Sequence, residues 1–272
     1  MRLRVDHATT YRYAPAKRGV VQSLRLWPSQ FAGQDVRFWD VAVEGPDAIR
    51  GTGFRDGAGD WIETASLRGA VDTVTVRVSG EVETRDTSGV VLGLKERVPP
   101  QAYLRPTRMT RREGAIVDLA AEATADATTP LDRAHALARA VTEAVVYRAG
   151  VTASDTTAAE ALALGEGVCQ DQAHVLIAAA QSTGTPARYV TGYLHADSDG
   201  QFHEASHAWA ELWVEGLGWV GFDPANGCCP NELYIRIGSG HDAVAAAPIR
   251  GVSAGGGDEN MEVAVTVMES AQ

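Results

Sequence analysis

The chain contains three cysteines, and one of them, Cys169, occupies a position that favours a nucleophile. It follows the turn-forming stretch Gly-Glu-Gly-Val at 165–168 and opens an Ala-rich segment, which predicts a helix from about Cys169 to Ser182 that Gly184 ends. The first-turn amides of a helix carry partial positive charge, which stabilises a thiolate. Cysteine is also a small apolar side chain that commonly packs in a core, so the position alone does not establish catalysis.

Two later residues, His207 and Asp223, are of the types that a cysteine nucleophile needs. Each lies eight residues from Glu215 in a pattern typical of two strands. A hairpin turning near Glu215 and Gly216 would pair them in matched register on one face, and a shifted turn would require a bulge. His207 would then take the thiol proton while Asp223 fixes its tautomer. The alternatives are a hydrogen-bonded core histidine and a turn aspartate before Pro224.

The same region carries a competing pattern. His203, Glu204 and His207 match H-E-x-x-H, in which two histidines on one helix face bind zinc and the glutamate acts as general base. Two arguments favour a strand instead. The turn-rich segment 197–200 immediately precedes the match, and a zinc site would leave Cys169 without a base.

The rest of the chain predicts an α+β protein in two parts. Residues 1–95 read as an all-β, sandwich-like region, with strands at Leu3–Tyr13, Val20–Leu26, Val36–Val43 and Val71–Glu83. Residues 96–272 read as an α+β core that ends in a strand. Its helices are expected at 111–124, 131–146, 157–165 and 169–182, and its strands at 187–194, 206–214, 218–222 and 261–268.

Four stretches of the chain resemble the transglutaminase-like cysteine protease superfamily, in its bacterial branch. The matching stretches are Gly167–His174, Ala187–Leu194, Ser206–Val214 and Gly218–Gly227, in that order. More loosely, His7–Tyr13 and Leu24–Pro28 are similar to the N-terminal β region of these bacterial proteins, and Pro248–Gly251 to their tail.

The resemblance implies a papain-like core in which Cys169 is the nucleophile, His207 the base and Asp223 the orienting group. It implies thioester chemistry on a peptide or protein amide, which is hydrolysis if water attacks the acyl-enzyme and transamidation if an amine does. No organic cofactor and no metal is expected. Animal transglutaminases depend on calcium, but this sequence has no pattern typical of a calcium-binding loop. A non-catalytic module that uses the same fold to grip a peptide stays an alternative.

Supporting roles are open to several further residues. The amide of Cys169 is a natural oxyanion donor, and Gln170 or Tyr147 could supply a second. Three tryptophans flank the expected hairpin and could wall an acyl groove, although core packing would account for at least two of them; they are Trp209, Trp213 and Trp219.

Composition narrows the function classes. The 272 residues carry a net charge of -11, which disfavours nucleic acid, and the Arg-rich stretch 105–112 has no interleaved aromatics. No apolar run reaches the ~18 residues that a membrane helix needs, and no signal peptide is visible.

The adjacent Cys228 and Cys229 make an awkward pair for one tetrahedral metal, so we expect both to be small buried side chains. Three cysteines without a disulfide pattern indicate a reducing, cytoplasmic setting. No feature of the sequence specifies an oligomeric state.

Overall fold

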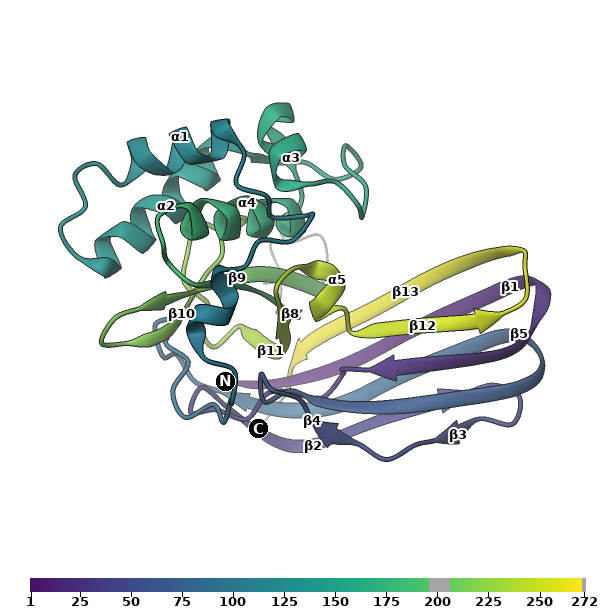
Figure 1. Cartoon of the computed structure of the whole chain (residues 1–272). Helices are drawn as coiled ribbons and strands as arrows, with labels where there is room; N and C mark the ends of the chain where they lie inside the picture. Colours follow the sequence, from purple (N-terminus) through teal and green to yellow (C-terminus); the bar gives the residue numbers. More distant parts are fainter. Residues whose placement is uncertain (196–205, 271–272) are drawn as a thin grey trace.

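A computed structural model describes residues 1–195 and 206–270 (Figure 1). It confirms a mixed α+β protein in which an N-terminal β-sheet region precedes an α+β core. Helices cover one face of a central sheet, and the long strands of the β region lie on its other side (Figure 1). Within these described residues, no helix combines the length and apolar character needed to cross a membrane.

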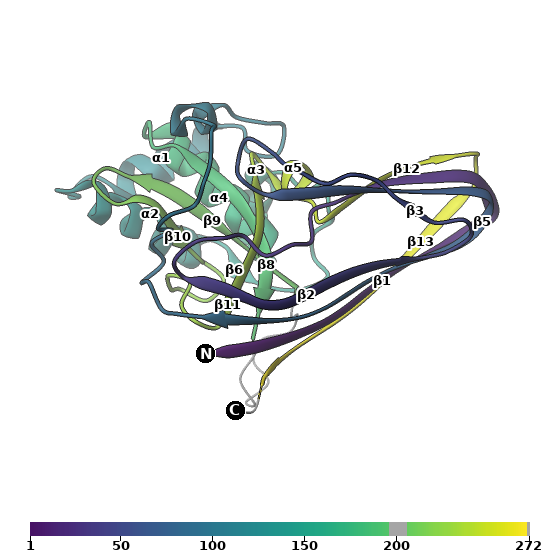
Figure 2. The ribbon, with the colours of Figure 1, turned by 90° about the horizontal axis from the view of Figure 1, so that it is seen from below.

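The β region is built on two long strands that share one sheet. Its strands are β1 (Arg2–Leu24), β2 (Gln34–Glu44), β3 (Ile49–Arg50), β4 (Phe54–Arg55), β5 (Trp61–Thr84), β12 (Ile249–Ala254) and β13 (Asp258–Glu269). β1 and β5 pair antiparallel, with register breaks between Arg12 and Gly19. Both strands turn back at the end farthest from the helices (Figures 1 and 2). The two segments predicted as separate strands at the N-terminus are therefore halves of β1.

The turn folds the sheet onto itself, so that its halves pack face to face. The first half of β1 pairs with β13 and the second half with β12. Leu24 and Ala65 from one half share a buried cluster with Val41 and Val76 from the other. Alternate residues of each strand point inward because successive side chains lie on opposite faces. This packing explains the sandwich-like pattern of the sequence.

The tail of the chain completes the N-terminal sheet. Residues 96–272 were expected to form the core, whereas β12 and β13 pair along β1, for example Val5 with Val267 and Val21 with Val252. Without the tail, β1 would be an edge strand with unpaired backbone groups.

The α+β core surrounds one buried helix. Its elements are η1 (Pro100–Leu104), α1 (Gly114–Ala123), α2 (Pro130–Ala144), β6 (Val146–Tyr147), α3 (Ala158–Leu164), β7 (Glu166–Gly167), α4 (Cys169–Ser182), β8 (Ala187–Leu194), β9 (Ser206–Val214), β10 (Gly218–Phe222), β11 (Tyr234–Gly240) and α5 (Ala243–Ala246). The sheet order is β10-β9-β8-β11, with all neighbours antiparallel. Small residues of α4 pack on Ala208, Ala210 and Leu212 of β9, which brings the helix close to the sheet.

The other face of the sheet is attached to the β region by an apolar cluster and a buried ionic network. Glu211 on β9 accepts hydrogen bonds from Arg188 Nε (2.6 Å) and Arg236 Nε (2.7 Å). Arg236 also contacts Asp60 of the β region, 3.2 Å from Nη1 to Oδ1. All four side chains are at least 98 % buried. Because removal of one partner would strand a buried charge, the network fixes how the β region meets the sheet.

Candidate active site

Cys169 is the first helical residue of α4, as the sequence predicted. The helix start is held by Asp171, whose Oδ2 accepts from the amide of Val168 (2.8 Å) and from Thr152 Oγ1 (2.6 Å). Gly167 leaves room for this cap, since a Cβ there would lie 2.8 Å from the Asp171 carboxylate. The turn and the capped start of α4 therefore fix the backbone position of Cys169.

His207 and Asp223 meet on the neighbouring hairpin, with 2.7 Å between His207 Nε2 and Asp223 Oδ2. The predicted matched register is wrong by two residues, because β9 and β10 pair Phe222 with Ala210. Extended by one residue, this register sets Asp223 opposite Trp209. A shift of two keeps both side chains on one face, so no bulge is needed and the pair meets diagonally.

His207 interacts with both Asp223 and Cys169. Burial lowers the pKa of His207, but hydrogen bonds to Asp223 and Cys169, together with their charges, outweigh burial and raise that pKa to about 10. Since Nε2 faces Asp223, Nδ1 is the nitrogen left for the Cys169 sulfur. The arrangement holds an imidazolium at neutral pH, which is the form that stabilises a thiolate.

Sequence reasoning missed two groups that contact Asp223. Asn226 Nδ2 donates to Asp223 Oδ2 over 2.6 Å, and the Tyr234 hydroxyl donates to the same oxygen over 2.8 Å. Asn226 follows Asp223 by three residues in a turn, so the polar turn composition was a weak signal for it. Nothing local marks Tyr234, which reaches the site from β11.

The two expected oxyanion residues flank the helix start. Gln170 donates from Nε2 to the carbonyl of Ser154 (3.2 Å), so its amide is directed at the loop before α3. Tyr147 lies on β6 and pairs with Gly167, two residues before Cys169. Their role as donors to an oxyanion stays a prediction.

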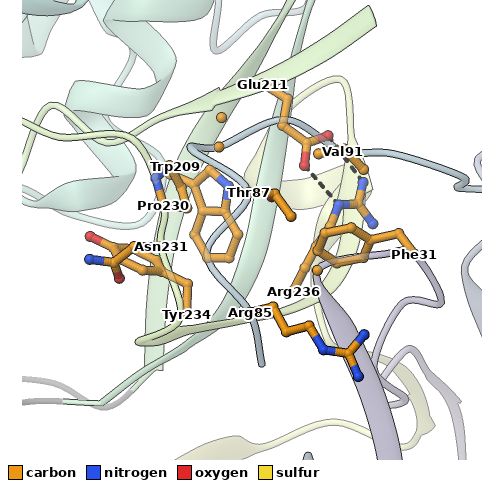
Figure 3. A pocket seen from close by; sticks show the side chains of 13 residues that line it. Phe31, Arg85, Thr87, Val91, Trp209, Glu211, Pro230, Asn231, Tyr234 and Arg236 are labelled. Atoms are coloured by element: carbon orange, nitrogen blue, oxygen red, sulfur yellow. Dashed lines mark hydrogen bonds and ion pairs between the residues drawn. The ribbon is translucent and has the colours of Figure 1, made fainter. Parts of the chain in front are cut away.

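The three tryptophans lie around the hairpin at different depths. Trp209 and Trp219 are each 98 % buried, whereas Trp213 is partly exposed. Trp219 packs under the Arg188 guanidinium, 4.0 Å from its carbon to the ring centroid. Trp209 lines a small cavity of about 30 Å³ together with Tyr234 (Figure 3). A role for any of them in a substrate groove stays a prediction.

The remaining thiols lie beside a larger cavity. Cys229 is partly buried, but Cys228 is exposed, against the expectation of two buried side chains. Cys228 lies in the turn that follows Asp223, where its backbone pairs with Asp223. Both thiols line a cavity of about 350 Å³ between α2 and this turn, with Asp223 in its wall. Burial raises the pKa of Cys229 to about 11, so this thiol is a weak nucleophile at neutral pH.

The zinc pattern is only partly visible. His203 and Glu204 lie outside the described residues. His207 belongs to a strand, and its Nε2 contacts the Asp223 carboxylate. Over residues 1–195 and 206–270, no group of three or more His, Cys, Asp or Glu side chains is arranged to hold a metal ion.

Comparison with known proteins agrees with this fold. Residues 117–224, which include Cys169, His207 and Asp223, match the transglutaminase-like superfamily, and residues 3–83 match the bacterial transglutaminase-like N-terminal region. A solved structure from Cytophaga hutchinsonii, described as that of a candidate cysteine protease, aligns with a TM-score of 0.74 at 20 % identity. It covers 100 % of this chain and 92 % of that one. The molecule thus has the fold of a transglutaminase-like core behind a β-sheet region.

Two curated relatives extend along nearly the whole chain. An uncharacterized protein of Mycobacterium leprae is 31 % identical over 284 residues and covers 98 % of both chains. One of Mycobacterium tuberculosis is 29 % identical over 280 residues, with 92 % of this chain and 87 % of the relative covered. The chain belongs to the transglutaminase-like superfamily and carries its bacterial N-terminal region. Members of this superfamily are often cysteine peptidases.

Proposed function

We propose that the protein is a cysteine-dependent amide hydrolase or acyl transferase that acts on peptide or protein amides. Cys169 is the nucleophile, His207 the proton carrier and Asp223 its orienting group. The observation that supports the proposal is the 2.7 Å contact between His207 Nε2 and Asp223 Oδ2, with Cys169 close enough to raise the pKa of the same ring.

The first half-reaction forms a thioester. The Cys169 thiolate attacks the amide carbon, and the negative charge moves to the carbonyl oxygen, near the amides that begin α4. When the intermediate collapses, the C–N bond breaks and His207 gives its Nδ1 proton to the leaving amine. A histidine with a pKa of about 10 carries that proton throughout the neutral range.

The second half-reaction releases the acyl group. Neutral His207 accepts a proton from water or from an amine, whose oxygen or nitrogen attacks the thioester carbon. The C–S bond then breaks, which restores the thiolate and the imidazolium. Water yields an acid and an amine yields a new amide, so one set of residues supports both outcomes. None of these steps requires a metal or an organic cofactor.

The test is a screen for turnover with a matched control. The wild-type chain is incubated with a peptide library, with and without a labelled primary amine, beside Cys169→Ala and Cys228→Ser. Cleavage or amine incorporation that Cys169→Ala abolishes and Cys228→Ser retains would support the proposal. Activity lost to a chelator together with stoichiometric zinc would indicate a metallohydrolase instead, and tight peptide binding without turnover would indicate a binding module.

A further inference from the structure

Asp223 receives more hydrogen bonds than the orientation of His207 alone requires. Its side chain is fully buried, and Oδ2 lies 2.7 Å from His207 Nε2, 2.6 Å from Asn226 Nδ2 and 2.8 Å from the Tyr234 hydroxyl. Its other oxygen accepts from the amide of Ala225 over 3.0 Å. A buried carboxylate without such donors would favour its neutral form, so these bonds sustain its charge.

The two additional donors differ in how firmly they are held. Asn226 lies only three residues after Asp223, in the same turn, so it does not connect the carboxylate to another element. Tyr234 begins β11, at the opposite edge of the sheet from β10, and its residue is 93 % buried. Its ring packs edge-on against Trp209, with 5.5 Å between centroids. Figure 3 shows both rings on one side of the small cavity, beside Pro230 and Asn231.

The Tyr234 hydroxyl is a durable donor. Burial and the charge on Asp223 both raise the pKa of Tyr234 far above its ordinary value, so its proton stays in place. With that proton given to Asp223, the phenol oxygen can accept from Asn226 Nδ2 (3.3 Å). Tyr234 is thus the group that ties the carboxylate to a strand outside the hairpin.

We propose that Tyr234 is a positioning residue for the Cys169–His207 pair. Its bond to Oδ2 fixes the Asp223 carboxylate against Nε2, which keeps His207 protonated toward Cys169 and the sulfur reactive at neutral pH. The inference rests on the proposed function for the role of Cys169, but its test needs no substrate.

The experiment measures the rate at which iodoacetamide alkylates Cys169 in the full chain between pH 5 and 9.5, read by mass spectrometry. Tyr234→Phe removes only the hydroxyl. Tyr193→Phe is the matched control, because Tyr193 is also a buried tyrosine whose hydroxyl is bonded, in that case to His7. We expect the midpoint of the rate profile to rise by about one pH unit in Tyr234→Phe, as for loss of one hydrogen bond to a charged group. We expect equal rates at the alkaline plateau and an unchanged profile in Tyr193→Phe.

The double variant Tyr234→Phe/Asp223→Asn tests whether the effect passes through the carboxylate. A profile that matches Asp223→Asn alone supports this route, and a further shift overturns it. A wild-type profile in Tyr234→Phe overturns the inference, as does a uniform drop at every pH in both tyrosine variants. A shifted midpoint in a chain that turns over no amide would retain the inference and refute the proposed function. Turnover combined with an unshifted Tyr234→Phe midpoint would overturn the inference and retain the proposed function.

Discussion

Replacement of Asp223 by Asn is the most direct perturbation of the proposed site. The variant keeps the shape of the side chain but removes its charge, which is one of the causes that lift the pKa of His207 to about 10. Burial, the largest single influence, lowers this pKa, and Cys169 alone would then be left to raise it. We therefore expect the pKa of His207 to fall toward its ordinary value of 6.5 or below.

The size of the effect follows from the two protonation equilibria. At pH 8.5 a group with a pKa of about 10 is ~97 % protonated, and one with a pKa of 6.5 is ~1 % protonated. The imidazolium that stabilises the thiolate would thus decrease by up to ~100-fold. At pH 7 the same arithmetic takes the protonated fraction of His207 from ~100 % to ~24 %, so we expect alkylation of Cys169 by iodoacetamide to slow by at least about fourfold at this pH.

Asp242→Asn is the matched control for this variant. Asp242 is also buried, but its Oδ1 accepts from the amide of Ala245 at the start of α5. Alkylation in Asp242→Asn should follow the wild type. Equal rates in Asp223→Asn and the wild type, with both chains folded by circular dichroism, would refute the assignment of Asp223 as the group that keeps His207 charged.

The remaining predictions concern selectivity and stability. Iodoacetamide at pH 7 should label Cys169 at least about tenfold faster than Cys229, since a thiol with a pKa of about 11 is only ~0.01 % ionised there; equal slow labelling would count against an activated sulfur. Glu211→Ala should cost about 3–5 kcal/mol in urea unfolding, because it leaves two buried arginines uncompensated; a loss below ~1 kcal/mol would contradict this. Burial raises the pKa of Glu211, but two arginines lower it to about 2, so its stabilisation is complete above the unfolded value near 4.5 and should disappear as pH falls from there toward 2. That acid loss, followed by fluorescence, should be smaller in Glu211→Ala. Gly192→Ala should destabilise by about 1–3 kcal/mol, since its Cβ would overlap the Ile235 carbonyl and approach the Trp209 ring; a wild-type urea midpoint would refute this.

The elements that carry the site were predictable because their signals are local. The predicted segments 169–182, 187–194, 206–214 and 218–222 coincide with α4, β8, β9 and β10. A turn, an Ala-rich run and alternating apolar residues each specify structure over a few neighbouring residues. The Thr157–Glu160 capping box is likewise present at the start of α3. The spacing within one hairpin also predicted that His207 and Asp223 share a face, because a register shift by an even number of residues leaves both side chains on the same face.

The exact register was less accessible. The connection after Val214 places Gly216 in the left-handed region, and it sets Phe222 opposite Ala210. A change of turn length moves the register without changing either strand's pattern, so composition alone left it open. The diagonal contact between His207 and Asp223 follows from the turn that connects β9 to β10.

Tertiary structure alone decided the contacts between distant segments. β13 pairs with β1 across more than 240 positions of sequence, and Tyr234 reaches Asp223 from the far edge of the sheet. Glu211 on β9 likewise binds Arg188 on β8 and Arg236 on β11. By itself the sequence determined the helix that presents the sulfur, the strands that present the ring and carboxylate, and their order. Which residues surround and hold these groups was decided by folding, because long-range packing is selected by the whole core and leaves no pattern in the residues on either side of a contact.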